Sequence, residues 1–103
     1  QFITLEEEQS AIMNFLISKK DYVYLNDIFN LDCFNEYSVT YKRIYIPNQI
    51  KAINSLLEIF SKNNKGLSIE KRKNKLDKRV IEIKLKGELF LYKGWLNYLF
   101  NRL

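Results

Sequence analysis

The sequence predicts an α+β fold, mostly helical, in one domain that spans residues 1–103. Three glycines and one proline are too few for the many turns of an all-β protein. Apolar residues recur at helical spacing in several segments, whereas a single pair of neighbouring segments alternates in the manner of two strands. Hydrophobic residues make up 47% and charged residues 28% of the chain, which is typical of a folded domain. We therefore expect helices packed against one small sheet.

The first helix is expected over residues 5–19. Thr4 and Glu7 have the spacing of a capping box, in which each side chain bonds the backbone of the other residue. Apolar residues follow at helical spacing, namely Ile12, Phe15, Leu16 and Ile17. Lys19 and Lys20 suit the negative end of the helix dipole. The glutamates of the first turn are interpreted as partners of that dipole, not as catalytic acids.

Residues 21–46 give the least uniform pattern. The run 22–24 predicts a short strand, and the Asn-Asp pair that follows could cap a short helix. Over 37–46 the residues alternate as in a strand, although Ser38 could equally cap one or two helical turns. Five of the seven tyrosines fall in this part, at positions 22, 24, 37, 41 and 45. They are interpreted as half-buried side chains, with a stacking platform for single-stranded bases as the alternative.

Pro47 is of a residue type favoured at the first position of a helix, and we expect this helix to run to about Lys62. Its apolar stripe consists of Ile50, Ile53, Leu56, Leu57 and Phe60. The opposite face carries amide, hydroxyl and lysine side chains, which are groups that read base edges or bind phosphates. The candidate DNA-binding residues of this helix are Asn48, Gln49, Lys51 and Ser55.

Residues 67–86 predict a β-hairpin with a strongly basic end. Apolar and polar residues alternate before and after the turn-forming sequence Asn-Lys-Leu-Asp. The run 71–79 contains six bases and one acid, so its net charge of +5 equals that of the whole chain. Such focused charge indicates a polyanionic partner, although a solvated turn that uses charge to block edge pairing is the alternative. The candidate DNA-binding residues are Lys71, Arg72, Lys73, Lys75, Lys78 and Arg79.

A last helix is expected over residues 88–102, after Gly87 ends the hairpin. It has almost no polar face, and at about sixteen residues it is short for a bilayer span. A second copy of the chain could cover it, so we expect a homodimer whose interface includes Leu91, Trp95, Tyr98 and Leu99. An interfacial membrane anchor is the less favoured alternative, because the segment has few basic residues.

The composition excludes several kinds of site. Without histidine the chain can form neither a Ser-His nor a Cys-His nucleophile system, and one cysteine cannot build a structural zinc site. Three separate glycines form no phosphate-binding loop. We therefore expect a protein that is not an enzyme, with no metal, no cofactor and no evident small-molecule ligand. The lone Cys33 is expected to be buried, and the absence of a cysteine pair and of a signal-like segment predicts a cytoplasmic setting.

The predicted order of helix, short strand, two helices, basic hairpin and helix is similar to that of winged helix-turn-helix domains. The sequence YVYLNDI at residues 22–28 resembles the strand and second-helix entry of the MarR/SarA family of transcription regulators. Residues 50–57 resemble the recognition helix of that family. Residues 70–83 resemble its wing, in which an Asp and an Arg at the tip precede a strand. Small winged-helix accessory proteins of conjugative plasmids are similar in size and plan.

The resemblance implies a homodimer that binds double-stranded DNA sequence-specifically, with no membrane partner. Two recognition helices would enter successive major grooves, while wing residues reach the minor groove or the backbone and Asp77 orients Arg79. A transcription regulator is the function implied first. An accessory protein that binds a plasmid transfer origin is the alternative, and a protein-interaction module without DNA binding is a further one. Residues 37–46 stand as an insertion relative to the family, so docking led by the wing or by the helix stays open.

Overall fold

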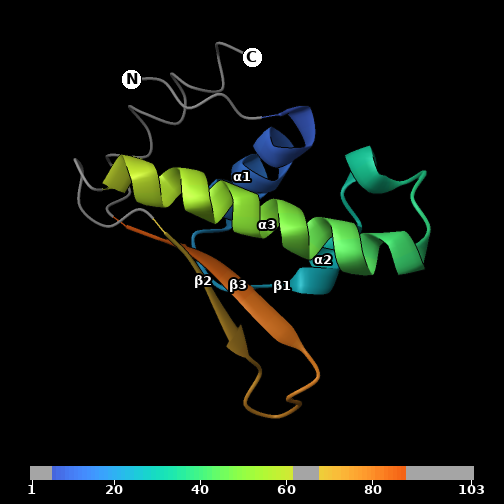
Figure 1. Ribbon diagram of the computed structural model, residues 1–103. Coiled ribbons are helices and arrows are strands. Elements are labelled where there is room, and N and C mark those ends of the chain that lie inside the picture. Colours follow the sequence, from blue (N-terminus) through green and yellow to red (C-terminus); the bar gives the residue numbers. More distant parts are fainter. Residues whose placement is uncertain (1–5, 62–67, 88–103) are drawn as a thin grey trace.

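The computed structural model describes residues 6–61 and 68–87 and shows an α+β fold, mostly helical, with a small antiparallel sheet (Figure 1). The described elements follow the chain as α1 (Glu7–Lys19), β1 (Val23–Tyr24), α2 (Leu25–Phe29), the 3-10 helix η1 (Asp32–Phe34), α3 (Val39–Ser61), β2 (Ser68–Lys73) and β3 (Ile81–Lys86). The expected fold class is confirmed at this level. The last expected helix, over 88–102, lies outside the described residues.

Helix α1 begins with a capping box formed by residues other than the expected pair. Glu6 is the N-cap residue, and its side chain accepts a hydrogen bond from the backbone N–H of Gln9. In return, Gln9 Oε1 accepts from the backbone N–H of Glu6 at 3.1 Å. Thr4, the cap expected from the sequence, lies outside the described residues. At the other end Lys20 adopts the left-handed conformation, with φ of 61°, and ends the helix.

Helix α3 is a single helix of 23 residues that includes the segment with strand-like alternation. Ser38 precedes it: its hydroxyl oxygen accepts from the backbone N–H of Tyr41 at 3.1 Å, and its carbonyl accepts from that of Lys42 at 3.0 Å. The helical alternative for this segment is therefore the correct one. The expected strand over 37–46 is wrong, and so is the expected helix start at Pro47, which lies inside α3.

Aromatic contacts hold the turns of α3 that precede Pro47. The rings of Tyr41 and Tyr45 stack with their centroids 5.0 Å apart, and Tyr37 meets both of them edge-on. Glu8 of α1 accepts hydrogen bonds from the hydroxyls of Tyr37, at 2.8 Å, and Tyr45, at 2.5 Å. An interior proline costs a helix about 3 kcal/mol. These contacts offset that cost, which explains why the helix begins before the proline.

The sheet has the strand order β1-β3-β2, with β3 in the centre. Val23 of β1 pairs with Ile83, and β2 pairs with β3 from Ser68↔Lys86 to Lys73↔Ile81. The hairpin expected over 67–86 is confirmed in its described part, with residues 74–80 as the connecting loop. Gly87 follows β3 with φ of 139°, a conformation that a Cβ atom disfavours.

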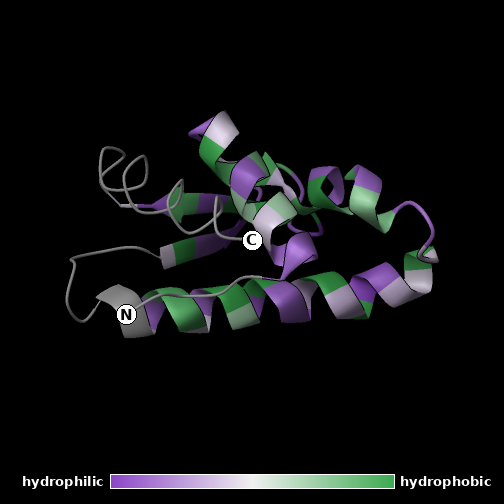
Figure 2. Cartoon of the chain, turned by 90° about the horizontal axis from the view of Figure 1, so that it is seen from above, coloured by the Kyte–Doolittle hydropathy of each residue, from purple (hydrophilic) through white to green (hydrophobic). Residues whose placement is uncertain are grey.

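The core lies where α1, α2, η1, α3 and one face of the sheet meet. In Figure 2, α3 is the long helix at the bottom, and the other described elements lie above it, against one face of this helix. The buried hydrophobic residues are Ile12, Met13, Leu16, Val23, Ile28, Phe34, Ile46, Ile50, Ile53, Leu57, Ile69 and Ile83. Cys33 is exposed, contrary to the expectation, because in η1 it is the next residue, Phe34, that enters the core.

The tyrosine contacts with Glu8 predict a loss of stability at alkaline pH. The hydrogen bond to Glu8 raises the pKa of Tyr45, and that of Tyr37 in the same way. Because the folded protein holds these protons more tightly than the unfolded chain does, the stabilisation is present below the ordinary tyrosine pKa of about 10. It is lost as the pH rises from there through the folded pKa. We expect Tyr45→Phe to flatten this fall in the free energy of unfolding.

Urea unfolding at a series of pH values from about 8 to 11 measures the effect. Tyr24→Phe is the matched control, because Tyr24 is an exposed residue of β1. An equally steep alkaline fall in the wild-type protein and in Tyr45→Phe would contradict the assignment.

Candidate nucleic-acid interface

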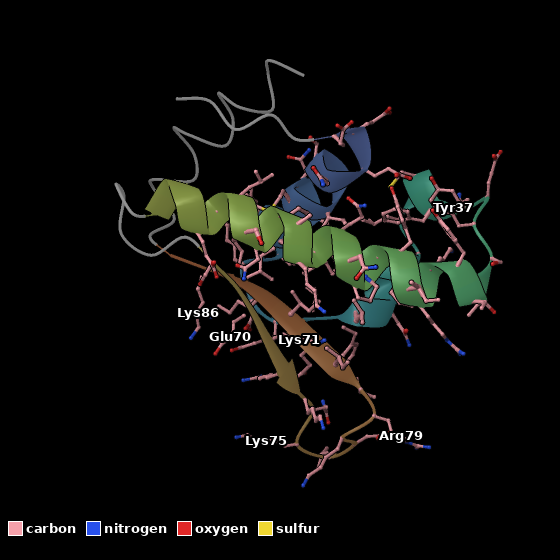
Figure 3. The ribbon with its side chains drawn as sticks, viewed as in Figure 1. Tyr37, Glu70, Lys71, Lys75, Arg79 and Lys86 are labelled. Atoms are coloured by element: carbon pink, nitrogen blue, oxygen red, sulfur yellow. The ribbon has the colours of Figure 1, made fainter. Side chains whose placement is uncertain are left out.

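The β2–β3 hairpin extends away from α3 and presents all six predicted basic residues in exposed positions (Figure 3). Lys75 and Arg79 lie at its far end, on the two sides of the loop, whereas Lys71 lies closer to α3. The run 71–79 has the same net charge as the whole chain. The excess positive charge is therefore presented on a protruding ribbon, where it is accessible to a large anion.

The loop at the end of the hairpin is held by the side chain of Asn74. Its Oδ1 accepts from the backbone N–H groups of Leu76, at 2.8 Å, and Asp77, at 3.1 Å. Two backbone hydrogen bonds close the loop: Asn74 N–H donates to the carbonyl of Val80 at 2.8 Å, and Val80 N–H donates to that of Asp77 at 3.0 Å. An Asn side chain that bonds the backbone two residues on defines an Asx turn. The loop therefore has a defined shape.

Asp77 and Arg79 form the contact that the resemblance implies. The carboxylate binds the guanidinium through two bonds, Nε to Oδ1 at 3.1 Å and Nη2 to Oδ2 at 3.2 Å. Asp77 Oδ1 also accepts from the backbone N–H of Arg79 at 3.0 Å. The pKa of Asp77 is lowered by these bonds from Arg79. Because the Arg79 side chain is 91% exposed, the pair contributes little stability, and its effect is to orient the guanidinium.

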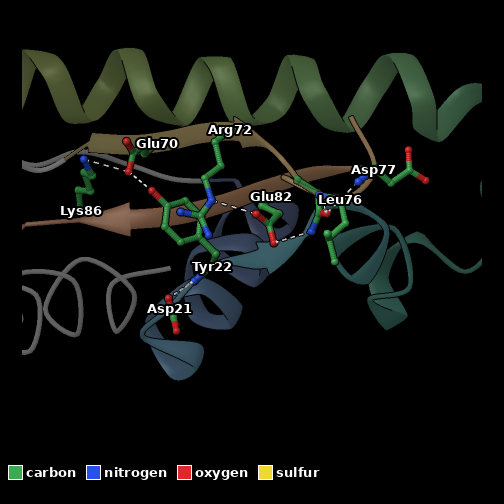
Figure 4. Close-up of polar contacts among 9 residues, drawn as sticks. Asp21, Tyr22, Glu70, Arg72, Leu76, Asp77, Glu82 and Lys86 are labelled. Carbon is green, nitrogen blue, oxygen red and sulfur yellow. Dashed lines mark hydrogen bonds and ion pairs between the residues drawn. The ribbon is translucent and has the colours of Figure 1, made fainter. Parts of the chain in front are cut away.

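Arg72 differs from the other hairpin bases because it is held against the sheet (Figure 4). Its Nε lies 2.9 Å from Oε1 of Glu82, the residue that faces it across the ladder. Its guanidinium lies over the ring of Tyr22, 3.4 Å from the centroid, in a cation–π contact. Glu82 also accepts from Nδ2 of Asn74 at 3.3 Å. Sequence reasoning missed the roles of Tyr22 and Glu82, because they depend on the strand register.

A second ion pair lies on the same face of the sheet. Glu70 accepts hydrogen bonds from the hydroxyl of Tyr22 and from Nζ of Lys86, the latter at 2.9 Å. These two donors lower the pKa of Glu70, and the carboxylate raises that of Tyr22. Lys84 lies 5.4 Å from the Tyr22 ring centroid. Lys84 and Lys86, which were not among the candidate residues predicted from the sequence, extend the basic surface along β3.

Strand alternation divides the hairpin bases between the two faces of the sheet. Lys71 lies on the face of Ile69, which packs toward α3, whereas Arg72 lies on the opposite face. Lys71 and Lys51 of α3 line the same small hollow, of about 60 Å³, together with Leu25, Pro47, Ile50 and Ile83. The structure thus brings together two basic residues, Lys51 and Lys71, that belong to separate candidate elements in the sequence.

The candidate residues of α3 divide into an exposed group and an engaged one. Asn48, Lys51 and Ser55 are exposed, and their spacing of three and four residues places them in one stripe along the helix. Gln49 lies elsewhere: its Oε1 accepts from Nε2 of Gln9 in α1 at 2.8 Å. Asn54, which was not a candidate, is engaged in a similar way, since its Oδ1 accepts from the backbone N–H of Ile69 at 2.9 Å. The exposed stripe therefore contains three of the four predicted residues.

The predicted interface residues Leu91, Trp95, Tyr98 and Leu99 lie outside the described residues. Within residues 6–61 and 68–87, no group of three or more cysteine, aspartate or glutamate side chains is placed to hold a metal ion. The same part of the chain contains no helix with the length and apolar character needed to cross a membrane.

Comparisons of the chain with protein-family models, with curated proteins and with solved structures give no match.

The role of Asn74 in the loop predicts a local effect of its removal. Asn74→Ala deletes the acceptor for two backbone N–H groups, so we expect the free energy of unfolding to fall by about 1–2 kcal/mol. Hydrogen exchange of the backbone amides of Leu76 and Asp77 should become faster, while the amides of α1 should keep the wild-type ranking of their exchange rates. Lys75→Ala, in the same loop, is the matched control and should leave both measurements unchanged. Equal exchange in Asn74→Ala and Lys75→Ala would remove Asn74 from this role.

Proposed function

We propose that the chain is a winged helix-turn-helix protein that binds double-stranded DNA, with the β2–β3 hairpin as its wing. The observation that carries the proposal is the exposure of six basic residues on one protruding hairpin, within a run whose net charge equals that of the chain. DNA presents a dense, regular array of phosphates, and lysine and arginine contacts to them provide most of non-specific affinity. The order of the described elements, α1, β1, α2, α3 and hairpin, supports this proposal.

The exposed stripe of α3 is proposed as the element that reads sequence. Asn48 and Ser55 offer hydrogen-bonding groups to base edges, and Lys51 offers a donor to guanine or phosphate. Lys51 and Lys71 line the same hollow, so the stripe and the inner face of the hairpin can contact one DNA segment together. Gln49 supports the stripe indirectly, since its bond to Gln9 ties α3 to α1.

We base the proposal of a homodimer on the apolar sequence of residues 88–103. One small domain has too little surface of its own to cover so many apolar side chains, whereas a second copy of the chain would supply it. Two copies related by a two-fold axis would read half-sites about 10 base pairs apart, or a multiple of that spacing. Transcription regulation is the proposed role. A plasmid accessory protein that binds near a transfer origin would use the same DNA contacts.

The proposal predicts DNA binding with a steep salt dependence. Each phosphate contact should contribute a slope of roughly −0.9 in log affinity against log salt concentration. Lys75→Ala with Lys78→Ala should therefore make the slope shallower by roughly one to two units and weaken binding at low salt. Fluorescence anisotropy with a labelled mixed-sequence duplex measures both quantities.

The matched control is Lys19→Ala with Lys20→Ala, which removes two exposed lysines from the end of α1. This variant should retain the wild-type slope. If it flattened the slope as much as the hairpin variant, the charge effect would be general and not local to the hairpin. If the wild-type protein failed to bind any duplex at low salt, the proposed function would be wrong, and a protein-interaction module would become the better explanation.

The proposed division of labour between helix and hairpin predicts two kinds of binding defect. Random-sequence selection with the wild-type protein should enrich a motif with two-fold symmetry. Lys51→Ala with Ser55→Ala should change or erase the preferred bases, because base contacts specify sequence, whereas Lys75→Ala should weaken binding to all sequences alike. Selection that returns the wild-type motif for the α3 variant would assign sequence reading to the hairpin instead.

A further inference from the structure

Leu76 is the most exposed of the large hydrophobic residues in the described part of the chain. Its surface is 97% exposed, whereas the other exposed ones, Tyr24, Val39, Tyr41 and Ile44, range from 47% to 66%. Leu76 borders a hollow between α2 and the hairpin loop, but it is almost entirely in solvent. A leucine so placed gives up the burial that normally stabilises it, which is worth about 1.5–3 kcal/mol.

The loop does not require a leucine at this position. Only the backbone of residue 76 takes part in the hydrogen bonds of the loop, since its N–H donates to Asn74 Oδ1. Lys20 is the only non-glycine residue in the described part of the chain with positive φ, so the backbone at Leu76 suits any ordinary residue. Turns usually carry polar residues at such positions. The Leu76 side chain is therefore available for a contact outside the molecule.

The surroundings of Leu76 define the chemistry of that contact. Lys75 and Lys78 are exposed beside it, and the Asp77 carboxylate is paired with Arg79. A partner must then offer negative charge around a narrow apolar space. In DNA, phosphates flank a groove whose floor consists of base-pair edges, and apolar side chains can enter from the minor groove into the apolar space between two stacked base pairs.

We propose that Leu76 is an apolar wedge that inserts between adjacent base pairs of the DNA bound by the hairpin. This inference rests on the proposed function and adds a mode of contact to it. The hydrogen-bonded loop holds the wedge at the end of the ribbon, and the adjacent lysines, Lys75 and Lys78, would bind the phosphates on either side. Insertion unstacks one base step and kinks the duplex, so flexible pyrimidine–purine steps such as TA are favoured.

The distribution of charge favours DNA over an anionic lipid surface. Lys71 and Lys73 lie along the ribbon, several residues behind Leu76, where strand residues advance by about 3.3 Å each. If the ribbon lies along a groove, all these basic side chains come close to phosphates. A planar surface touched by the loop alone would leave them at a distance, and a single leucine is a small anchor by comparison with typical membrane-binding elements.

The test uses the full chain and a duplex with 2-aminopurine at a central TA step, because 2-aminopurine fluoresces more strongly when it is unstacked. Wild-type protein at saturation should raise this fluorescence. Leu76→Ala should bind about tenfold more weakly, with an unchanged salt slope, and should abolish the rise. Leu76→Met should restore both, and Ile44→Ala, a matched exposed apolar residue of α3, should behave as the wild-type protein.

Each contrary outcome has a separate meaning. If Leu76→Ala binds and unstacks the duplex as the wild-type protein does, the wedge is overturned while DNA binding stands. If Leu76→Ala retains full duplex binding but loses sedimentation with phosphatidylserine vesicles, Leu76 contacts lipid, and the wedge is again overturned. If the wild-type protein binds no duplex, the proposed function and the wedge fall together.

Discussion

The position of the hairpin depends on the pairing of β3 on both of its edges. One edge bonds β1, which lies between α1 and α2, and the other bonds β2. In the middle of β3, Ile83 is 1% exposed and packs in the core. A two-stranded hairpin alone is marginally stable in water, and the third strand with a helix against one face is what makes it persist. Through β3, the helical part of the chain fixes the direction in which the hairpin extends.

Polar residues of the hairpin region divide into those that shape the hairpin and those that the hairpin presents to solvent. Asn54 satisfies a backbone group at the start of β2, Asn74 shapes the loop, and Asp77 orients Arg79. Lys75 and Lys78 are exposed in the same loop, and their positions follow from these bonds. Substitution of a residue that shapes the hairpin should therefore affect several contacts at once, whereas substitution of an exposed lysine should affect only the contact that this lysine makes.

The sequence was sufficient for features with a local origin and insufficient for those that depend on register. Alternation around turn-forming residues predicted the hairpin. The apolar stripe of α3 predicted an opposite polar face with Asn48, Gln49, Lys51 and Ser55, of which all but Gln49 are exposed. The start of α3 was missed because the same alternation fits a strand. The contacts of Tyr37 and Tyr45 with Glu8, which lies 29 and 37 residues away, favour the helix but cannot be read from the local sequence. The pairing of Arg72 with Glu82 could not be predicted without the register of β2 against β3. Gln49 is one position after Asn48 in the helix, so it lies outside the exposed stripe and contacts Gln9 of α1 instead.

The segregation of charge has a consequence for how the molecule meets its partners. Outside the run 71–79 the acidic and basic residues are equal in number, and three consecutive glutamates, Glu6, Glu7 and Glu8, lie at the start of α1, away from the hairpin. In the described part of the chain, this acidic cluster and the basic run are therefore separated in space. In the field of a polyanion such a molecule is turned while it is still diffusing, so that collisions are selected for hairpin-first encounters. For a polyanionic partner, the positions of the lysines would therefore influence the association rate as well as the final affinity.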